Sequence, residues 1–556
     1  QALAIKYFGD DDPIGKIIRL DDTYDLKVTG ILAGLPGNTH LRFEAVGSTA
    51  LIKNEPWIQD WWSNSFNTYV KVANGKDVDY LRASFPDFMN KYFAKDFARV
   101  GNKVGLALEP LQDIYFNYDT RYEDNIAHGD RRYVFVFSSV GLLLLLLASI
   151  NYVNLATAQA SERAKEVGIR KTLGSGQVRI IYQFLSESFV LCLVSLIVGM
   201  GIAQIAMPFL NSTLGISLPS IVDDSDLPWF LAMVLVFLTI CSGAYPAFFL
   251  STFKPVTVLK GEVKGNTRYL FLRKALVVFQ FAISAFMIIA TLFVAQQLHF
   301  MREKDLGFNA TQLMIVQINN GEIDRATFKE RLLREEGILK ATYTSGHPGG
   351  FYDATTVNIM GESQGMKMRT LWADEDLLET MDLSLASGRF FSRDFPADAT
   401  SSVILNETAV RQLGWSNEDA LGKQVILSQF DSVYKEVVGI VRDYHFTSLK
   451  EKIEPMIISH RDARGHLLVK LSGSELSNTI ARVERLWKSY DSGFPLEFTF
   501  LDDVIDRLYS SESQQGKIFT VFSFISVGIA CLGILGLASY MASQRRKEIG
   551  IRKVLG

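Results

Sequence analysis

The sequence predicts a polytopic α-helical membrane protein with two extracytoplasmic α+β domains. Two observations predict this fold class: five long apolar runs, and a basic motif that occurs twice, each time directly after such a run. At 556 residues the chain is too long for one core. Its 48% hydrophobic and 21% charged residues fit membrane spans that alternate with water-soluble domains.

Each apolar run is long enough for a helix that crosses a bilayer, which takes about 20 residues. We expect spans near residues 133–156, 179–207, 228–250, 273–297 and 518–541, and the part after Pro208 reads as a loop. Buried helices of a large soluble protein are the alternative, but so many runs of this length argue against it.

Lys and Arg in the connections orient the spans, because cytoplasmic loops carry an excess of positive charge. The segments 157–178, 251–272 and 542–556 are rich in these residues, whereas the loop 208–227 holds three Asp and no Lys or Arg. The basic segments are therefore expected in the cytoplasm. The large regions 1–130 and 299–516 are then expected outside.

The outer regions read as mixed α and β structure. Residues 26–32 and 436–441 are rich in β-branched residues and are predicted strands, and apolar residues about three apart predict a helix over 475–487. The expected organisation is an outer domain at 1–130, a transmembrane region at 131–298, a second outer domain at 299–516 and a further membrane segment at 517–556.

The basic motif is an internal repeat. Residues 160–174 read ASERAKEVGIRKTLG and residues 542–556 read ASQRRKEIGIRKVLG, with eleven of fifteen positions identical. The outer regions echo each other too, since Ile14-Gly15-Lys16 resembles Leu421-Gly422-Lys423. We interpret the chain as a tandem duplication of outer domain, span and basic cytoplasmic segment.

The repeated motif has the pattern of a helix that docks on a protein. Glu and Arg four apart support a helix, and Ile and Leu four apart form a small apolar edge. Contact with lipid head groups explains the basic residues but not the matched Glu, Gly, Ile and Leu. The candidate partner-binding residues are Lys165, Glu166, Gly168, Ile169, Arg170, Lys171, Leu173 and Gly174 in the first copy, and Lys547, Glu548, Gly550, Ile551, Arg552, Lys553, Leu555 and Gly556 in the second.

Glu187 lies early in the second expected span, only eight residues after Arg179. Charges within the membrane are costly and often functional. This position near the cytoplasmic interface leaves two interpretations open: snorkelling or helix packing on one side, and a functional role on the other.

The motif K-E-[VI]-G-I-R-K-x-L-G after a span resembles the signature of FtsX-like permeases, the MacB type of ABC transporter subunit. Asp12-Pro13-Ile14-Gly15-Lys16 is similar to the MacB-like periplasmic core domain, Tyr245-Pro246-Ala247 to the linker between the halves, and Phe500-Leu501-Asp502-Asp503 to the run before the later span. The resemblance implies MacB-like core domains at 1–130 and 299–516. It implies FtsX-like permease domains within 131–298 and 517–556.

The resemblance also implies a location and a mechanism. Such permeases are multi-pass proteins of the plasma (inner) membrane, and duplicated members have eight spans, so we expect this chain to be a fragment that lacks the first and the last two. They pair with a separate nucleotide-binding subunit, on which both copies of the motif act as coupling helices. ATP and Mg are therefore expected on the partner, and no cofactor on this chain.

The remaining motifs do not indicate enzyme chemistry. No GxxxxGK[ST] phosphate loop occurs, and the nearest candidate, Leu421-Gly422-Lys423-Gln424, lacks its spacing and hydroxyl. His460 and His466 have no third ligand in a recognisable metal motif, and the three cysteines read as buried apolar residues. A net charge of −3 gives no reason to expect nucleic acid.

Two non-enzyme functions stay open at this point. One is export or efflux of a peptide, drug or lipoprotein, with a membrane-fusion or outer-membrane protein as a further partner. The other is a signalling scaffold that activates an envelope protein by mechanotransmission across the membrane. Besides membrane lipid, the partner common to both is the ATPase subunit.

Overall fold

The computed structural model divides the chain into two units. One unit holds Gln1–Gly129 and Glu303–Ser511, and the other holds Asp130–Arg302 and Glu512–Gly556. The structure describes all residues except 21–23, 34, 36–38, 42, 56–57, 59–65, 101–104, 118–128, 215–225, 252–266, 319–323, 351, 362–364, 428–432, 462–464, 491–494 and 545–556.

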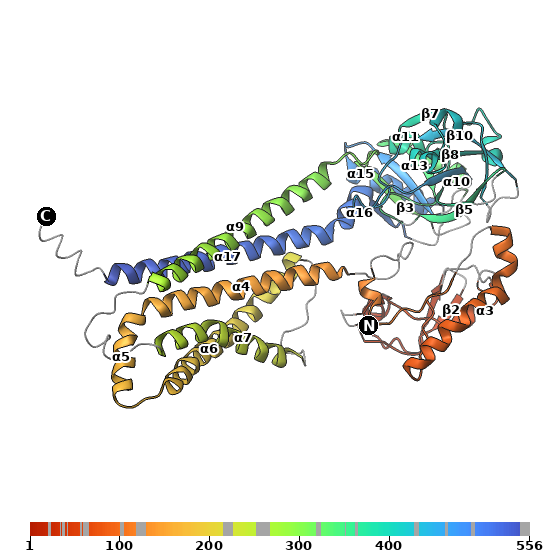
Figure 1. Ribbon diagram of the computed structural model, residues 1–556. Helices are drawn as coiled ribbons and strands as arrows, with labels where there is room; N and C mark the ends of the chain where they lie inside the picture. Colours follow the sequence, from red (N-terminus) through yellow and green to blue (C-terminus); the bar gives the residue numbers. More distant parts are fainter. Residues whose placement is uncertain are drawn as a thin grey trace, which may run out of the picture. The chain divides into compact units, whose positions relative to one another are not determined.

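The second unit is made of helices (Figure 1). They are α4 (Arg131–Ala158), α5 (Ala160–Thr172), α6 (Gln177–Leu214), α7 (Leu227–Ser251), α9 (Thr267–Glu303) and α17 (Ser510–Gln544). Among the described residues, all of these except α5 are long and apolar enough to cross a membrane, which makes five candidate spans. The polytopic membrane fold predicted from the sequence is confirmed.

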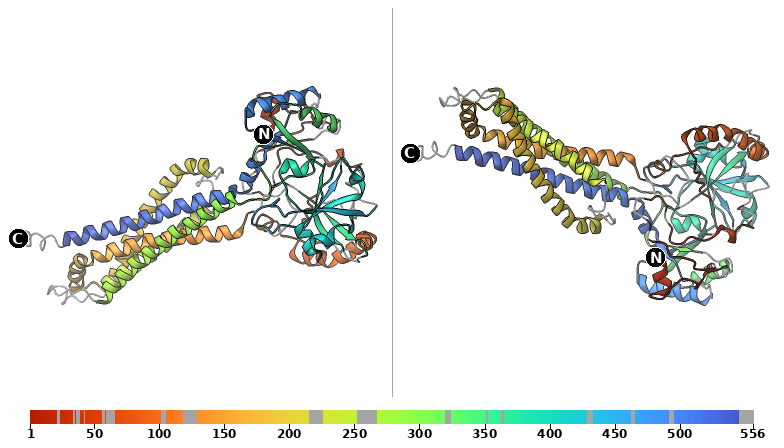
Figure 2. Two further views of the ribbon diagram at one scale, coloured as in Figure 1. Left: turned by 90° about the horizontal axis from the view of Figure 1, so that it is seen from above. Right: turned by 90° about the horizontal axis from the view of Figure 1, so that it is seen from below.

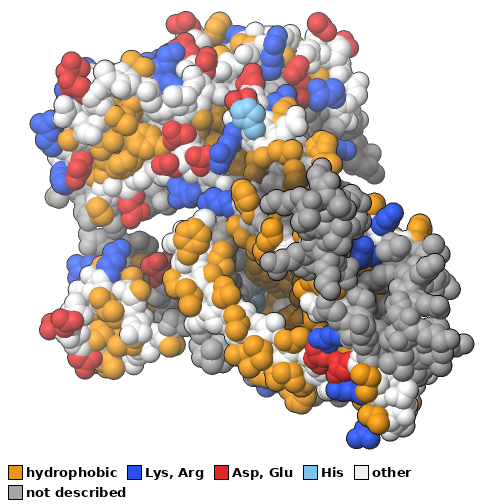
Figure 3. Space-filling model, turned by 90° about the vertical axis from the view of Figure 1, so that its left-hand side faces the viewer, with side chains coloured by type: hydrophobic (Ala, Val, Ile, Leu, Met, Phe, Trp, Pro, Cys, Tyr) orange, Lys and Arg blue, Asp and Glu red, His pale blue; other side chains and the backbone are white. Residues whose placement is uncertain are grey.

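Helix α6 differs from its prediction at one end. The sequence predicts a loop after Pro208, whereas the helix continues through this proline to Leu214. Proline is tolerated in membrane helices, where neighbouring groups satisfy the backbone that it frees. Figure 3 shows hydrophobic side chains gathered in dense patches on one face of the molecule. On α6, Ile197, Ile202 and Ile205 are exposed, as a lipid-facing helix requires.

Helices α4, α9 and α17 share an apolar core with a few polar contacts. Leu147 of α4 and Met287 of α9 are almost fully buried in this core, against Phe519, Phe522 and Ile529 of α17. Figure 2 shows α9 and α17 side by side in both views. Hydrogen bonds join them, from Gln280 Nε2 to the Ala530 carbonyl at 3.1 Å and between the hydroxyls of Ser284 and Ser526 at 3.3 Å. Such bonds help helices associate where lipid supplies no hydrophobic drive.

The part of the first unit from residue 303 to 511 is built on one 11-stranded sheet. Its strands are β3 (Leu313–Gln317), β4 (Ile338–Thr344), β5 (Asp353–Ile359), β6 (Met366–Ala373), β7 (Leu385–Gly388), β8 (Ser402–Asn406), β9 (Gln424–Leu427), β10 (Lys435–Val441), β11 (Met456–His460), β12 (His466–Leu471) and β13 (Phe498–Phe500). The predicted strand 436–441 is thus confirmed within β10.

Six of these strands close into a ring. Their order is β11-β8-β10-β9-β5-β6, and β6 pairs back on β11 in parallel from Met456↔Arg369 to His460↔Ala373. Inward side chains such as Val357, Val403 and Val437 are fully buried in one cluster. Closure leaves no free edge within the ring, which protects these strands from pairing with other chains.

Strand β7 pairs with β10 in antiparallel, and the remaining strands β4, β12, β3 and β13 form an extension with helices against both faces. Alternate residues of β3 enter different cores, with Met314 and Val316 in one and Leu313 and Ile315 in the other. The first core includes residues of α10 (Arg325–Leu332) and α15 (Leu476–Ser489), and the second includes residues of α11 (Leu377–Met381) and α16 (Leu501–Leu508). The predicted helix 475–487 is confirmed as α15. Further short helices are α12 (Asp398–Ser401), α13 (Glu407–Gln412) and α14 (Asn417–Ala420).

The N-terminal part of the first unit has less regular structure in its described residues. It holds α1 (Ala2–Phe8), the antiparallel pair β1 (Ile17–Leu20) and β2 (Tyr24–Lys27), α3 (Gly75–Val100), and the short helices η1 (Thr49–Leu51) and η2 (Ile114–Phe116). The predicted strand 26–32 was wrong beyond Lys27. The register of β1 and β2 ends at Ile17↔Lys27. Val28 still exchanges backbone hydrogen bonds with Lys16 and Gly15, but Gly15 has a φ of 86°, so the partner segment turns there and the ladder stops.

Candidate functional site

The first copy of the repeated motif forms helix α5, which follows α4 after Gln159 alone. The Glu166 carboxylate lies 2.6 Å from the guanidinium of Arg170, one helical turn away, as the sequence spacing predicts. Gly174 ends the helix with a φ of 91°, a left-handed conformation that favours glycine. Around it the Ser175 amide donates to the Arg170 carbonyl at 3.0 Å.

One stripe of α5, made of Arg163, Val167 and Lys171 at intervals of four residues, anchors the helix to the bundle. Val167 is buried in a cluster with Ile180, Phe184 and Ala247. At the end of the stripe, Lys171 Nζ donates to the Ser251 carbonyl of α7 at 2.5 Å. This stripe therefore connects α5 to both α6 and α7.

Arg163 makes the most specific of these contacts. Its guanidinium donates two parallel hydrogen bonds to the Glu187 carboxylate of α6, at 2.8 and 2.7 Å, and stands 5.7 Å from the centre of the Phe184 ring. The hydrogen bonds to Glu187 raise the pKa of Arg163 above its ordinary value. Glu187 is thus an ion-pair partner in the packing of α5 on α6.

A different edge of α5 is left uncovered by the part of the chain that the structure describes. The exposed fractions of Ile169 and Leu173 are 51% and 81%, and Glu166 beside them is also exposed. Gly168 is buried, and the helix runs through it without a break. These two exposed apolar side chains, one turn apart, offer a small apolar contact surface.

The predicted site residues divide into three groups. Glu166, Ile169 and Leu173 are on the uncovered edge, while Lys171 contacts α7 and Arg170 hydrogen-bonds Gln183 of α6. Lys165 belongs to α5, but its side chain is outside the described residues, as are Lys547, Glu548, Gly550, Ile551, Arg552, Lys553, Leu555 and Gly556 of the second copy.

Sequence reasoning did not find every residue that holds α5 in place. It singled out Glu187 but not its partner Arg163, although Arg163 and Arg545 match in the two copies of the motif. It also missed Gln183 and Ser251, whose contacts with α5 depend on how α6 and α7 fold back. The matched arginine was the signal that could have indicated an ion pair.

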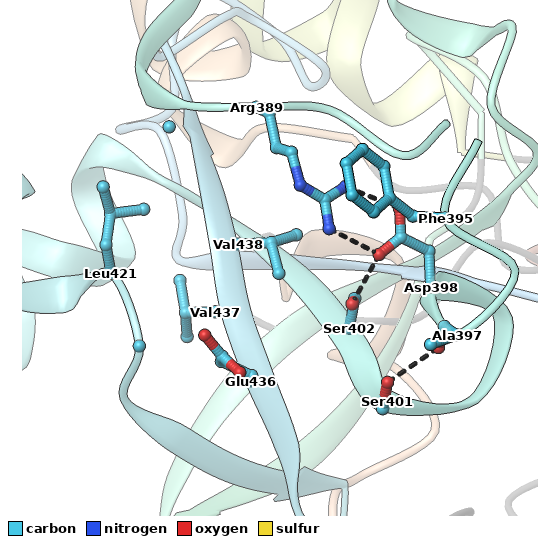
Figure 4. A pocket seen from close by; sticks show the side chains of 12 residues that line it. Arg389, Phe395, Ala397, Asp398, Ser401, Ser402, Leu421, Glu436, Val437 and Val438 are labelled. Atoms are coloured by element: carbon cyan, nitrogen blue, oxygen red, sulfur yellow. Dashed lines mark hydrogen bonds and ion pairs between the residues drawn. The ribbon is translucent and has the colours of Figure 1, made fainter. Parts of the chain in front are cut away.

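The 303–511 segment has a surface groove of about 560 Å³, lined by residues that include Arg389, Phe395, Asp398 and Glu436 (Figure 4). Arg389 donates two hydrogen bonds to Asp398 at 2.6 and 2.8 Å, and the Phe395 ring centre lies 4.2 Å from its guanidinium carbon. Burial acts to raise the pKa of Asp398, but hydrogen bonds from Arg389, Ser402 and the Ser392 amide bring it below its ordinary value. The buried carboxylate thus serves as an ion-pair partner.

Two family models match the chain. One, described as FtsX-like permease C-terminal, covers residues 138–255, and the other, described as MacB-like periplasmic core domain, covers residues 275–485. The first match contains α5, and the second begins within α9.

The chain is also similar to curated proteins named macrolide export ATP-binding/permease protein MacB. That of Aggregatibacter actinomycetemcomitans is 22% identical over 197 residues, which is 34% of this chain and 27% of the relative. That of Bdellovibrio bacteriovorus is 22% identical over 47% of this chain and 38% of the relative. That of Syntrophobacter fumaroxidans is 32% identical over 22% of this chain and 17% of the relative. The aligned regions thus span less than half of each relative.

Two solved structures resemble parts of the chain. The periplasmic region of MacB from Actinobacillus actinomycetemcomitans matches with a TM-score of 0.28 and 18% identity over 37% of this chain and 97% of its own. The extracellular domain of the noncanonic ABC-type transporter YknZ from Gram-positive bacteria matches with a TM-score of 0.25 and 13% identity over 34% of this chain and 97% of its own. The chain thus contains an FtsX-like permease region at 138–255 and a MacB-like periplasmic core domain within 275–485, and it is similar to the MacB relatives over part of their length.

Proposed function

We propose that the chain is the permease subunit of an ABC transporter, and that it couples ATP hydrolysis by a separate nucleotide-binding subunit to movement of its extracytoplasmic domains. The uncovered apolar edge of α5 is the observation that carries this proposal. Ile169 and Leu173 are exposed on a short helix between two spans, on the side that the basic segments assign to the cytoplasm, where ATP is available.

The sequence and the relatives bear on where ATP is hydrolysed. The 556 residues hold no GxxxxGK[ST] loop for phosphates, whereas the relatives are named ATP-binding/permease proteins and extend well beyond the aligned regions. We therefore place ATP hydrolysis outside these residues, on the partner that docks on α5. The exposed edge of α5 gives that partner an apolar contact, with Glu166 available for a charged contact beside it.

The proposed transport direction is export of a peptide, drug or lipoprotein. The names of the relatives, which describe macrolide export, support export over import. Five candidate spans and a large extracytoplasmic region fit a protein that acts on a molecule at the outer face of the membrane.

The test is co-purification in detergent of an ATPase subunit with the chain and with the variant Ile169→Asp/Leu173→Asp. We expect the variant to insert normally and to lose the ATPase, because two carboxylates on the docking edge prevent burial against the partner. Leu339→Asp is a matched control, since Leu339 is 57% exposed on β4, outside the membrane unit. Retention of the ATPase by the double variant would refute docking through α5.

A further inference from the structure

The strongest unexplained feature of the membrane unit is an ion pair between a cytoplasmic helix and a membrane span. Arg163 and Glu187 lie 24 residues apart, and their side chains are only 34% and 38% exposed. Both hydrogen bonds of the guanidinium fork are made, so the pair fixes the direction of both side chains as well as their distance. A surface ion pair of loose geometry would not do this.

The ion pair lies on one side of α5, and the uncovered edge, which is the proposed docking edge of Ile169 and Leu173, lies on another. At about 100° per residue, Arg163, Val167 and Lys171 follow one stripe, and Ile169 and Leu173 follow another. The first stripe is covered by α6 and α7, and the second is exposed. A partner bound to Ile169 and Leu173 therefore leaves the Arg163 contact in place.

We propose that Arg163 and Glu187 are positioning residues that transmit force, so that a push or pull on the docking edge of α5 turns into a displacement of span α6 rather than a pivot of α5 alone. This inference rests on the proposed function. The Arg163 and Lys171 contacts lie eight residues apart on α5, two turns of helix, and reach different spans. Among the side chains that the structure describes in the N-terminal half of α5, Arg163 makes the polar contact to α6, and removing it removes that contact.

Charge and location explain why this link suits transmission. Glu187 belongs to the apolar span, where an unpaired carboxylate is costly, so the pair resists separation while α5 moves. The ring centre of Phe184, one turn before Glu187, lies 5.7 Å from the guanidinium and adds a cation–π contact to the pair. A lysine at position 163 would keep the charge but could not make the two parallel hydrogen bonds.

The experiment measures two quantities on the full chain in liposomes: binding of the ATPase subunit and stimulation of its ATP hydrolysis. The variants are Glu187→Gln, Arg163→Lys and the charge exchange Arg163→Glu/Glu187→Arg. Glu330→Gln is the control, because Glu330 is paired only loosely with Arg334, at 4.0 Å, on an exposed surface of α10.

We expect Glu187→Gln and Arg163→Lys to bind the ATPase as the unaltered chain does but to lose stimulation at least about fivefold, the lower end of usual coupling between linked sites. The charge exchange should recover at least part of the stimulation. Full stimulation in Glu187→Gln, or no recovery by the exchange, would overturn the link. Loss of ATPase binding in both single variants would overturn it too, by showing that the pair serves docking alone.

Failure of the underlying proposal gives a different result. If the unaltered chain binds no ATPase, or if Ile169→Asp/Leu173→Asp still binds it, docking on α5 is wrong whatever the ion-pair variants do. If binding of the ATPase requires Ile169 and Leu173 but stimulation of its ATP hydrolysis is unchanged in the Arg163 and Glu187 variants, the proposed function stands. Only the transmission of force through the ion pair is then refuted.

Discussion

The rings of His347 and His466 are in contact at the end of the extension formed by β4, β12, β3 and β13, where β4 ends and β12 begins. Their ring centres are 4.9 Å apart in a T-shaped contact, and His347 Nδ1 lies 3.0 Å from the Pro348 carbonyl. Burial lowers the pKa of both side chains, and the neighbouring His347 contributes to lowering the pKa of His466 to about 4. Neutral imidazoles thus fill a site where a proton is unfavourable.

Lowering the pH should therefore reduce the free energy of unfolding of the 303–511 segment through protonation of His466. Between about pH 6.5 and pH 4 the unfolded chain binds a proton at this residue that the folded chain does not, so stability is fully present above pH 6.5 and is lost as the pH falls. The full loss is on the order of 3 kcal/mol. Three apolar cores close within residues 303–511, so this segment can be tested as a soluble domain.

The measurement is thermal or urea unfolding of that segment at pH 7.5 and at pH 5, with His466→Gln for comparison. The variant should lose less stability on acidification than the unaltered domain, because one proton-binding difference has been removed. An equal loss in both would show that His466 titrates normally and that other groups cause the acid sensitivity.

The contacts of individual side chains were the hardest feature to predict from the sequence. The sequence offered His460 and His466 as a pair to be weighed for metal binding, yet His460 contacts Glu375 at 3.1 Å and His466 packs on His347. These partners are 85 and 119 positions away in the chain. Spacing along a strand or helix carries information about near neighbours only, so contacts set by tertiary folding lie beyond it.

Among the elements, α17 packs so closely on α4 that one glycine is required. A Cβ on Gly533 would lie 2.1 Å from Asn151 Oδ1, and Asn151 Nδ2 donates to the Ile529 carbonyl at 2.6 Å. Gly533→Ala should push the Asn151 side chain away, break this hydrogen bond and separate the helices slightly. An interhelical hydrogen bond in a membrane is worth about 0.6 kcal/mol on average.

Gly528, five residues earlier in α17, supplies the matched control because nothing lies within 4 Å of a Cβ built there. Gly528→Ala should leave stability unchanged or raise it, since alanine is the better helix former. The midpoint temperature of thermal aggregation in detergent measures the stability of both variants. Equal midpoint temperatures for the two would contradict the close approach of α4 and α17.

The elements themselves were predictable to very different degrees. Composition alone located the five spans, because a bilayer demands an unbroken apolar helix. Strand β10 followed from its β-branched run, but the ring closure between β6 and β11 could not be foreseen, since Arg369 and Met456 meet across 87 positions. The short strand β2 was overextended for a similar reason, because its length is set by its partner β1.

On the scale of the whole molecule, everything proposed for α5 depends on which side of the membrane it faces. Basic residues after α4, α7 and α17 place these ends in the cytoplasm, and the large regions before α4 and between α9 and α17 outside. The repeated motif then occurs on the cytoplasmic side in both copies. The proposed docking of an ATPase inside the cell requires this orientation.

Single-cysteine labelling tests the orientation directly. With Cys192, Cys241 and Cys531 replaced by alanine, Leu173→Cys and Leu339→Cys provide exposed thiols on α5 and β4, at positions where leucine is 81% and 57% exposed. In spheroplasts a membrane-impermeant maleimide should label position 339 at once and position 173 only after the membrane is opened. Labelling of position 173 in sealed spheroplasts would put α5 outside, beyond the reach of any ATP-hydrolysing partner, and the docking and transmission proposals would fall together.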